Sequence, residues 1–85
     1  MPYIIKEARK RFETIIDEVQ SDCPENAGEL NYLITCILHK YVQEHGECYQ
    51  IYNDIMGVLE GSKLEIYRRA ITEYEEYKRI LNGDV

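Results

Sequence analysis

The sequence has no tryptophan, one phenylalanine, two prolines and three cysteines among its 85 residues. The cysteines (Cys23, Cys36 and Cys48) are odd in number, which argues against a disulfide framework and favours a reducing compartment. The first residues lack the long apolar region of a secretory signal, and no apolar run approaches the ~20 residues that a membrane span needs. We therefore expect a cytoplasmic protein with no membrane partner.

Basic residues are scarce in the middle of the chain. The net charge is -6, and residues 21–62 hold seven acidic residues against one basic residue, Lys40, whereas the two flanking segments are balanced. A surface for long nucleic acid needs clustered lysine and arginine, so this class of partner is disfavoured. A local basic site remains possible at either end of the chain.

Apolar residues recur at helical spacing in three segments and predict an all-α fold without strands. The segments are about 6–21, 27–45 and 49–81, and Pro24 separates the first two. Asn26 with Glu29 indicates a capped start of the second helix, and Gly46 indicates its end. We expect one domain over 1–85, built as a small bundle of three to four helices.

The third segment is long for a chain of this size. A continuous helix over 49–81 would span about 50 Å, whereas a compact chain of this length has a diameter near 30 Å, or about twice a radius of gyration of roughly 12 Å. Either the helix breaks at 57–62, at Gly57 or at Gly61, or its end packs on another subunit. Gly61-Ser62 followed by Glu65 is a second capping signal and favours a break. A chain this short buries only about 60% of its unfolded surface, so we expect it to form a homo-oligomer.

Two arrangements of cysteine and histidine resemble catalytic or metal sites. Cys36-x-x-His39 and His45-x-x-Cys48 read as zinc ligands, but His45 lies about 120° around the helix from His39. Cys36 and His39 could also form a nucleophile and base, yet no third residue orients them. We expect no metal, no cofactor and no enzymatic activity.

A cluster of cations and aromatic rings in the third segment is the best candidate for a ligand site. Lys63 falls within the apolar stripe with Glu60 one turn earlier, and Arg68 and Arg69 follow beside Tyr67. Arginine binds phosphate in bidentate fashion and tyrosine stacks on planar rings, as a nucleotide-like ligand requires. The alternative is that Lys63 reaches solvent and the arginines form ion pairs between subunits.

A polar and aromatic ridge on the second helix faces either a pocket or solvent, and its members are Asn31, Tyr32, Thr35 and His39. The full set of candidate ligand-binding residues from both segments is Arg68, Arg69, Lys63, Tyr67, Tyr74, Tyr32, His39, Asn31 and Glu60.

Four sequence patterns carry a resemblance to a known family: Glu29-Leu-Asn-Tyr-x-Ile-Thr35, Tyr52-Asn-Asp-Ile-Met-Gly-Val-Leu-Glu60, Lys63-Leu-Glu-x-Tyr-Arg-Arg69 and Asn82-Gly-Asp-Val85. Together they resemble a family of small uncharacterised proteins from bacteriophages, bacteria and metagenomes. The resemblance covers nearly the whole chain and implies a phage accessory protein, without an activity or catalytic residues.

Two functions remain open. The first is an anti-defence protein that sequesters a small anionic, nucleotide-derived signal in pockets between subunits, in the cytoplasm of the host cell if the protein is phage-encoded. This function rests on an analogy with small phage proteins that counter host immunity. The second is a homo-oligomeric protein-interaction or structural module that binds a host or phage protein through an exposed apolar stripe.

Overall fold

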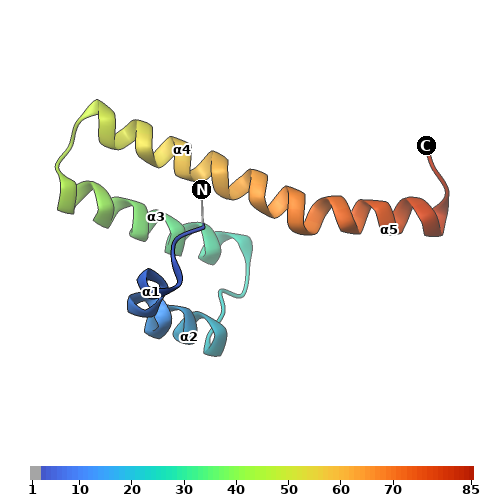
Figure 1. The fold of residues 1–85 in the computed structure, drawn as a ribbon, viewed down its shortest axis with the longest axis horizontal. Coiled ribbons are helices and arrows are strands. Elements are labelled where there is room, and N and C mark those ends of the chain that lie inside the picture. Colours follow the sequence, from blue (N-terminus) through green and yellow to red (C-terminus); the bar gives the residue numbers. More distant parts are fainter. Residues whose placement is uncertain (1–2) are drawn as a thin grey trace. The chain divides into compact units, whose positions relative to one another are not determined.

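The computed structural model describes residues 3–85, which form three helical stretches and no strand (Figure 1). The first stretch comprises α1 (Lys6–Arg9), the 3-10 turn η1 (Lys10–Phe12) and α2 (Glu13–Ser21). The second is α3 (Ala27–His45). The third comprises α4 (Tyr49–Ile66), the π-helical turn η2 (Tyr67–Ile71) and α5 (Thr72–Asn82). The predicted all-α class is confirmed, although the first two residues of the predicted 1–85 domain lie outside the described part.

Both ends of α3 follow from local side-chain chemistry. The side chain of Asn26 accepts a hydrogen bond from the Glu29 amide at 2.9 Å, and the Glu29 carboxylate accepts one from the Glu25 amide at 3.0 Å. At the other end Gly46 has φ 88°, a backbone conformation that glycine adopts without steric cost. The predicted cap and stop of this helix are therefore confirmed.

The third stretch passes through Gly57 and Gly61 without interruption (Figure 1). The alternative of a break at 57–62 is wrong, because Ser62 lies inside α4 and caps nothing. A glycine in a helix interior costs only about 1 kcal/mol relative to alanine, which is too little to end a long helix. The helix is irregular only later, at η2, where backbone hydrogen bonds span five residues instead of four for one turn.

The described chain divides by its internal contacts into two units, Tyr3–Ile55 and Met56–Val85. In the first unit Ile55 is the buried hydrophobic residue at 6% exposure, and it is the one buried hydrophobic side chain among the described residues. Partly buried apolar side chains in the same unit are Ala8, Leu33, Leu38, Val42 and Ile51. The described part of the second unit, Met56–Val85, is a helical stretch with its short tail, and none of these residues is buried.

Candidate functional site

Two arginines of η2 converge on one carboxylate oxygen. Arg68 donates from Nη2 to Oε1 of Glu65 at 2.8 Å, and Arg69 donates from Nε to the same oxygen at 2.5 Å. The spacing of three and four residues along a helix permits both bonds at once. The Glu65 side chain is only 18% exposed, whereas both guanidinium groups remain largely exposed. These three side chains therefore form a compact charged group whose cationic side faces solvent.

Glu65 was absent from the predicted site, although the sequence contained a signal for it. Acidic residues three or four positions before arginine on a helix are the usual partners of that arginine. The arginines were expected to meet phosphate or an acidic segment of another subunit, and the structure shows that a carboxylate of their own helix is already within bonding distance.

Lys63 and Glu60 form a weaker pair on the same helix. The Lys63 Nζ atom lies 3.6 Å from Oε1 of Glu60, and both side chains are mostly exposed. Such exposed pairs contribute little because water and salt screen the two charges. The Lys63 ammonium therefore reaches solvent despite its position within the apolar stripe.

The two candidate tyrosines of this stretch are both exposed. Tyr67 lies in η2, and Tyr74 lies in the first turn of α5. The ammonium of Lys78 stands over the Tyr74 ring at 5.7 Å from its centroid, so one face of that ring has a cationic neighbour.

The ridge on α3 belongs to the unit Tyr3–Ile55 and is described within that unit. The Asn31 side chain accepts a hydrogen bond from the Thr35 hydroxyl at 3.5 Å, which joins two polar residues of the ridge. Tyr32 is exposed, and a hydrogen bond with the Cys36 side chain raises the pKa of its phenol. His39 is also exposed. The structure thus links Asn31 to Thr35 and Tyr32 to Cys36, one helical turn apart in each case.

The residues that resembled a zinc site show separate arrangements. Cys36 and Cys48 are exposed and form no disulfide. The centroid of the His45 ring lies 4.3 Å from the centroid of the Tyr41 ring. Among residues 3–85 no group of three or more histidine, cysteine, aspartate or glutamate side chains could hold a metal ion.

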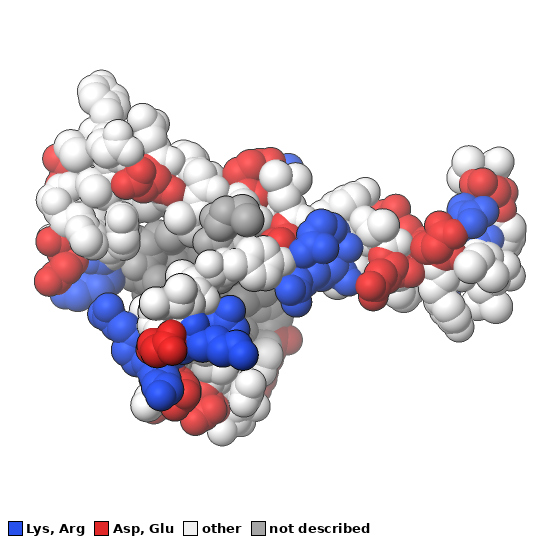
Figure 2. Space-filling model, viewed as in Figure 1, with Lys and Arg blue, Asp and Glu red and all other residues white. Residues whose placement is uncertain are grey.

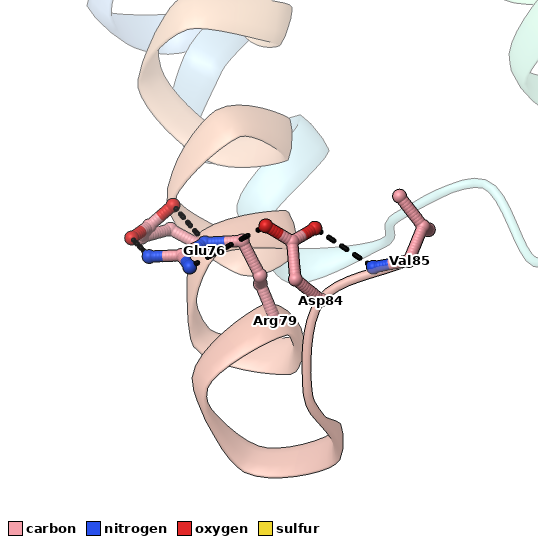
Figure 3. Close-up of polar contacts among 4 residues, drawn as sticks. All are labelled: Glu76, Arg79, Asp84 and Val85. Carbon is pink, nitrogen blue, oxygen red and sulfur yellow. Dashed lines mark hydrogen bonds and ion pairs between the residues drawn. The ribbon is translucent and has the colours of Figure 1, made fainter.

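The C-terminal tail and the end of α5 together line an open surface hollow of about 480 Å³. The Arg79 guanidinium forms an ion pair with Glu76, and its Nη1 atom lies 3.8 Å from Oδ2 of Asp84 (Figure 3). The Oδ1 atom of Asp84 accepts a hydrogen bond from the Val85 amide at 2.8 Å. The residues that line this hollow are Thr72, Glu75, Glu76, Lys78, Arg79, Asn82, Gly83, Asp84 and Val85. None of the nine predicted site residues lines it. A sequence signal existed only for the Glu76–Arg79 pair, through its helical spacing.

Acidic and basic side chains alternate along the third helical stretch on the face that Figure 2 presents. Ion pairs along this stretch, from Lys63–Glu60 to Arg79–Glu76, join neighbouring acidic and basic side chains. The charges are thus largely compensated along the helix itself. No helix of the described residues is long and apolar enough to cross a membrane.

Comparison with known proteins places the chain in a family. No curated protein and no solved structure matches it at a significant level. A family model described as a domain of unknown function, DUF6899, matches residues 1–85. Because the match covers the whole sequence, the chain belongs to the DUF6899 family.

Proposed function

We propose that the protein is a homo-oligomeric protein-interaction or structural module, and that its third helical stretch supplies the contact surface. The observation that carries this proposal is the helical stretch of residues 56–85, whose large apolar side chains are all exposed. They are Met56, Val58, Leu59, Leu64, Ile66, Tyr67, Ile71, Tyr74, Tyr77, Ile80, Leu81 and Val85.

Residues 56–85 contain no buried side chain and so have no core of their own. Most helical stability in proteins comes from packing of an apolar face against other elements. Each Å² of apolar surface removed from water contributes about 25 cal/mol. A complex in which a partner covers this helix is therefore stabilised along the whole length of the contact. The stretch therefore has the properties of a docking element.

Leu64 and Ile66 provide a matched test of this proposal. Their exposed fractions are 58% and 59%, but they lie two positions apart and so on opposite sides of α4. We take the side of the helix that carries Leu59 and Ile66, seven positions apart, as the contact surface, and Leu64 lies opposite to it. We expect Ile66→Lys to lower the mass measured by light scattering after size exclusion, because it places a charge in the contact surface. Leu64→Lys should leave the mass of the wild-type oligomer unchanged. A monomeric wild-type chain that also captures no protein, or equal behaviour of the two variants, would contradict the proposal.

A second candidate function follows from the convergence of Arg68 and Arg69 on one oxygen of Glu65. Two guanidinium groups aimed at a single oxygen match the geometry of phosphate recognition, and both remain exposed to a ligand. In this function a phosphate oxygen displaces the Glu65 carboxylate, and an exposed tyrosine such as Tyr67 stacks on the base. The protein then acts as a phage accessory protein that sequesters a nucleotide-derived signal of host defence.

Calorimetric titration with a panel of cyclic dinucleotides and ADP-ribose derivatives tests this second candidate. Binding that is lost in Arg68→Ala and kept in Arg79→Ala supports it, because Arg79 forms a comparable pair with Glu76 elsewhere on the helix. Absence of heat and of thermal stabilisation with every member of the panel would rule it out.

A further inference from the structure

The third helical stretch carries a heptad pattern that changes phase once, at η2. Before η2 the positions that repeat at heptad spacing are Leu59, Ser62 and Ile66, and after it they are Ala70, Tyr74, Tyr77 and Leu81. Within each half the spacing alternates between three and four residues, as in helices that pair along their length. Between Ile66 and Ala70 the spacing is four residues, whereas the alternation requires three, so this segment contains one extra residue. We call these seven positions the heptad stripe.

The π-helical turn compensates for that extra residue. The Thr72 amide donates to the carbonyl oxygen of Tyr67, a bond across five residues instead of four. A turn of this kind holds one more residue than an α-helical turn, so the residues after it regain the rotational position they would have without the insertion. The two halves of the heptad stripe therefore lie on one side of the helix. A continuous stripe of this length is a surface for another helix.

We propose that the occupant of the heptad stripe is the same stripe of a second copy, in antiparallel orientation, with the twofold axis at the level of Arg68. This inference rests on the proposed function as an interaction module and assigns its partner, orientation and register. A contact of this type is self-complementary, so every residue pair across the axis occurs twice.

Side-chain size favours the antiparallel orientation. With the axis at Arg68, Ser62 faces Tyr74 of the second copy, and Ile66 faces Ala70 of the second copy. Each small side chain thus meets a large one, and alternation of large and small residues is what fills an interface without voids. A parallel pair would place Ser62 on Ser62 and Tyr74 on Tyr74, with gaps at one level and crowding at the other.

The charges beside the heptad stripe favour the same orientation. Glu73 precedes Tyr74 beside the stripe, and its carboxylate forms no ion pair or hydrogen bond with the other described residues. With the axis at Arg68, Glu73 of one copy lies at the level of Lys63 of the second copy, whose side chain is mostly exposed. A parallel pair would instead place Glu73 level with Glu73 and Lys63 level with Lys63. Antiparallel pairing thus replaces like charges at both levels by opposite charges, which favours this orientation and this register.

Cysteine cross-linking distinguishes the two orientations in the full-length chain. The background carries Cys23→Ser, Cys36→Ser and Cys48→Ser, which replace three exposed thiols. In this background we expect a mixture of the Ser62→Cys chain and the Tyr74→Cys chain to form a mixed disulfide dimer on oxidation. Each chain alone should give little dimer, because its two cysteines lie about 18 Å apart along the axis, twelve positions at 1.5 Å each. Cross-linking of either chain with itself, or of neither with the other, would overturn the antiparallel assignment.

Charge reversal tests the register. Glu73→Lys should weaken self-association about tenfold in analytical ultracentrifugation, because it places a cation at the level of the second copy's Lys63. Glu75→Lys is the matched control: it makes the same change in the same helical turn, away from the stripe, and should leave the dissociation constant unchanged. Equal effects of the two variants would overturn the register. These failures are distinct from failure of the proposed function, which would leave the wild-type chain monomeric and without a protein partner.

Discussion

The Asn26 side chain accepts a hydrogen bond from the Glu29 amide at 2.9 Å and so satisfies one of the free amides at the start of α3. The Glu29 carboxylate accepts in turn from the Glu25 amide, so the residues of this turn bond to one another in both directions. These two bonds fix where the second helix begins. They also make the start of α3 a place where single substitutions have calculable effects.

Asn26→Ala should destabilise α3 by about 1 kcal/mol, because an alanine side chain leaves the Glu29 amide without an acceptor. Asn26→Asp keeps an acceptor oxygen at the same position and should retain most of the stability. The measurement is thermal unfolding followed by circular dichroism at one fixed protein concentration. Equal melting temperatures for Asn26→Ala and the wild type would show that this cap contributes nothing.

Substitution by alanine should change the stability of the protein in opposite directions at two glycines, Gly57 and Gly46. Gly57 lies inside α4 with open space where a Cβ atom would stand, so Gly57→Ala should stabilise the helix by about 0.5–1 kcal/mol. Gly46 also has open space, but its φ of 88° strains any residue with a Cβ atom, so Gly46→Ala should destabilise. Urea unfolding of the two variants provides the comparison. A stabilising Gly46→Ala would mean that α3 does not need this conformation at its end.

Stability at the end of α5 should depend on pH through Glu76. Hydrogen bonds from Arg79 hold the pKa of Glu76 below its ordinary value near 4.3. A carboxylate whose pKa is lower in the folded state stabilises that state above the unfolded-state pKa, and this stabilisation is lost as the pH falls through the folded-state pKa. We expect helicity to decrease on acidification below about pH 4.3, and this part of the decrease to be absent in Glu76→Gln.

Other carboxylates also titrate in that range, so the informative quantity is the difference between variants. Glu75→Gln removes a neighbouring carboxylate that makes no ion pair with Arg79, and should keep the acid-dependent loss of helicity. Identical titration curves for Glu76→Gln and the wild type would contradict the role of the Glu76–Arg79 pair.

The positions of the helices could be predicted because their causes are local. Pro24, the Asn26 cap and Gly46 each act on neighbouring backbone groups, and the apolar period of the intervening segments reports the helices directly. Continuity through Gly57 and Gly61 was harder to predict, because a glycine and a capping signal inside a long helix act in opposite directions to its other residues. The structure shows that the helix-forming residues on either side prevail.

The candidate site was only partly visible in the sequence. The pairing of Arg68 with Glu65 follows from residue spacing alone and could have been read from it. The π-helical turn could not, because nothing in the composition of Tyr67–Ile71 distinguishes a bond across five residues from one across four. Its trace in the sequence is the single irregular spacing between Ile66 and Ala70, which is meaningful only once the turn is known.

Changes of one residue in chain length give the sharpest test of the π-helical turn. Deletion of Arg68 removes the extra residue, so η2 can become a regular α-helical turn while both halves of the heptad stripe keep their alignment. We expect the shortened chain to retain self-association and to show equal or higher helicity. Arg69 then stands three positions after Glu65 and can keep one ion pair with it.

Insertion of one alanine between Arg68 and Arg69 should have the opposite effect. One π-helical turn accommodates one extra residue, so a second extra residue rotates Tyr74 and the positions after it by about 100° relative to Ile66. The heptad stripe is then divided between two faces, and self-association measured by ultracentrifugation should weaken more than tenfold, which corresponds to about 1.4 kcal/mol. If the deletion and the insertion weakened association equally, the turn would be an ordinary local distortion. Retention in the first and loss in the second is expected only if η2 keeps the two halves of the stripe in register.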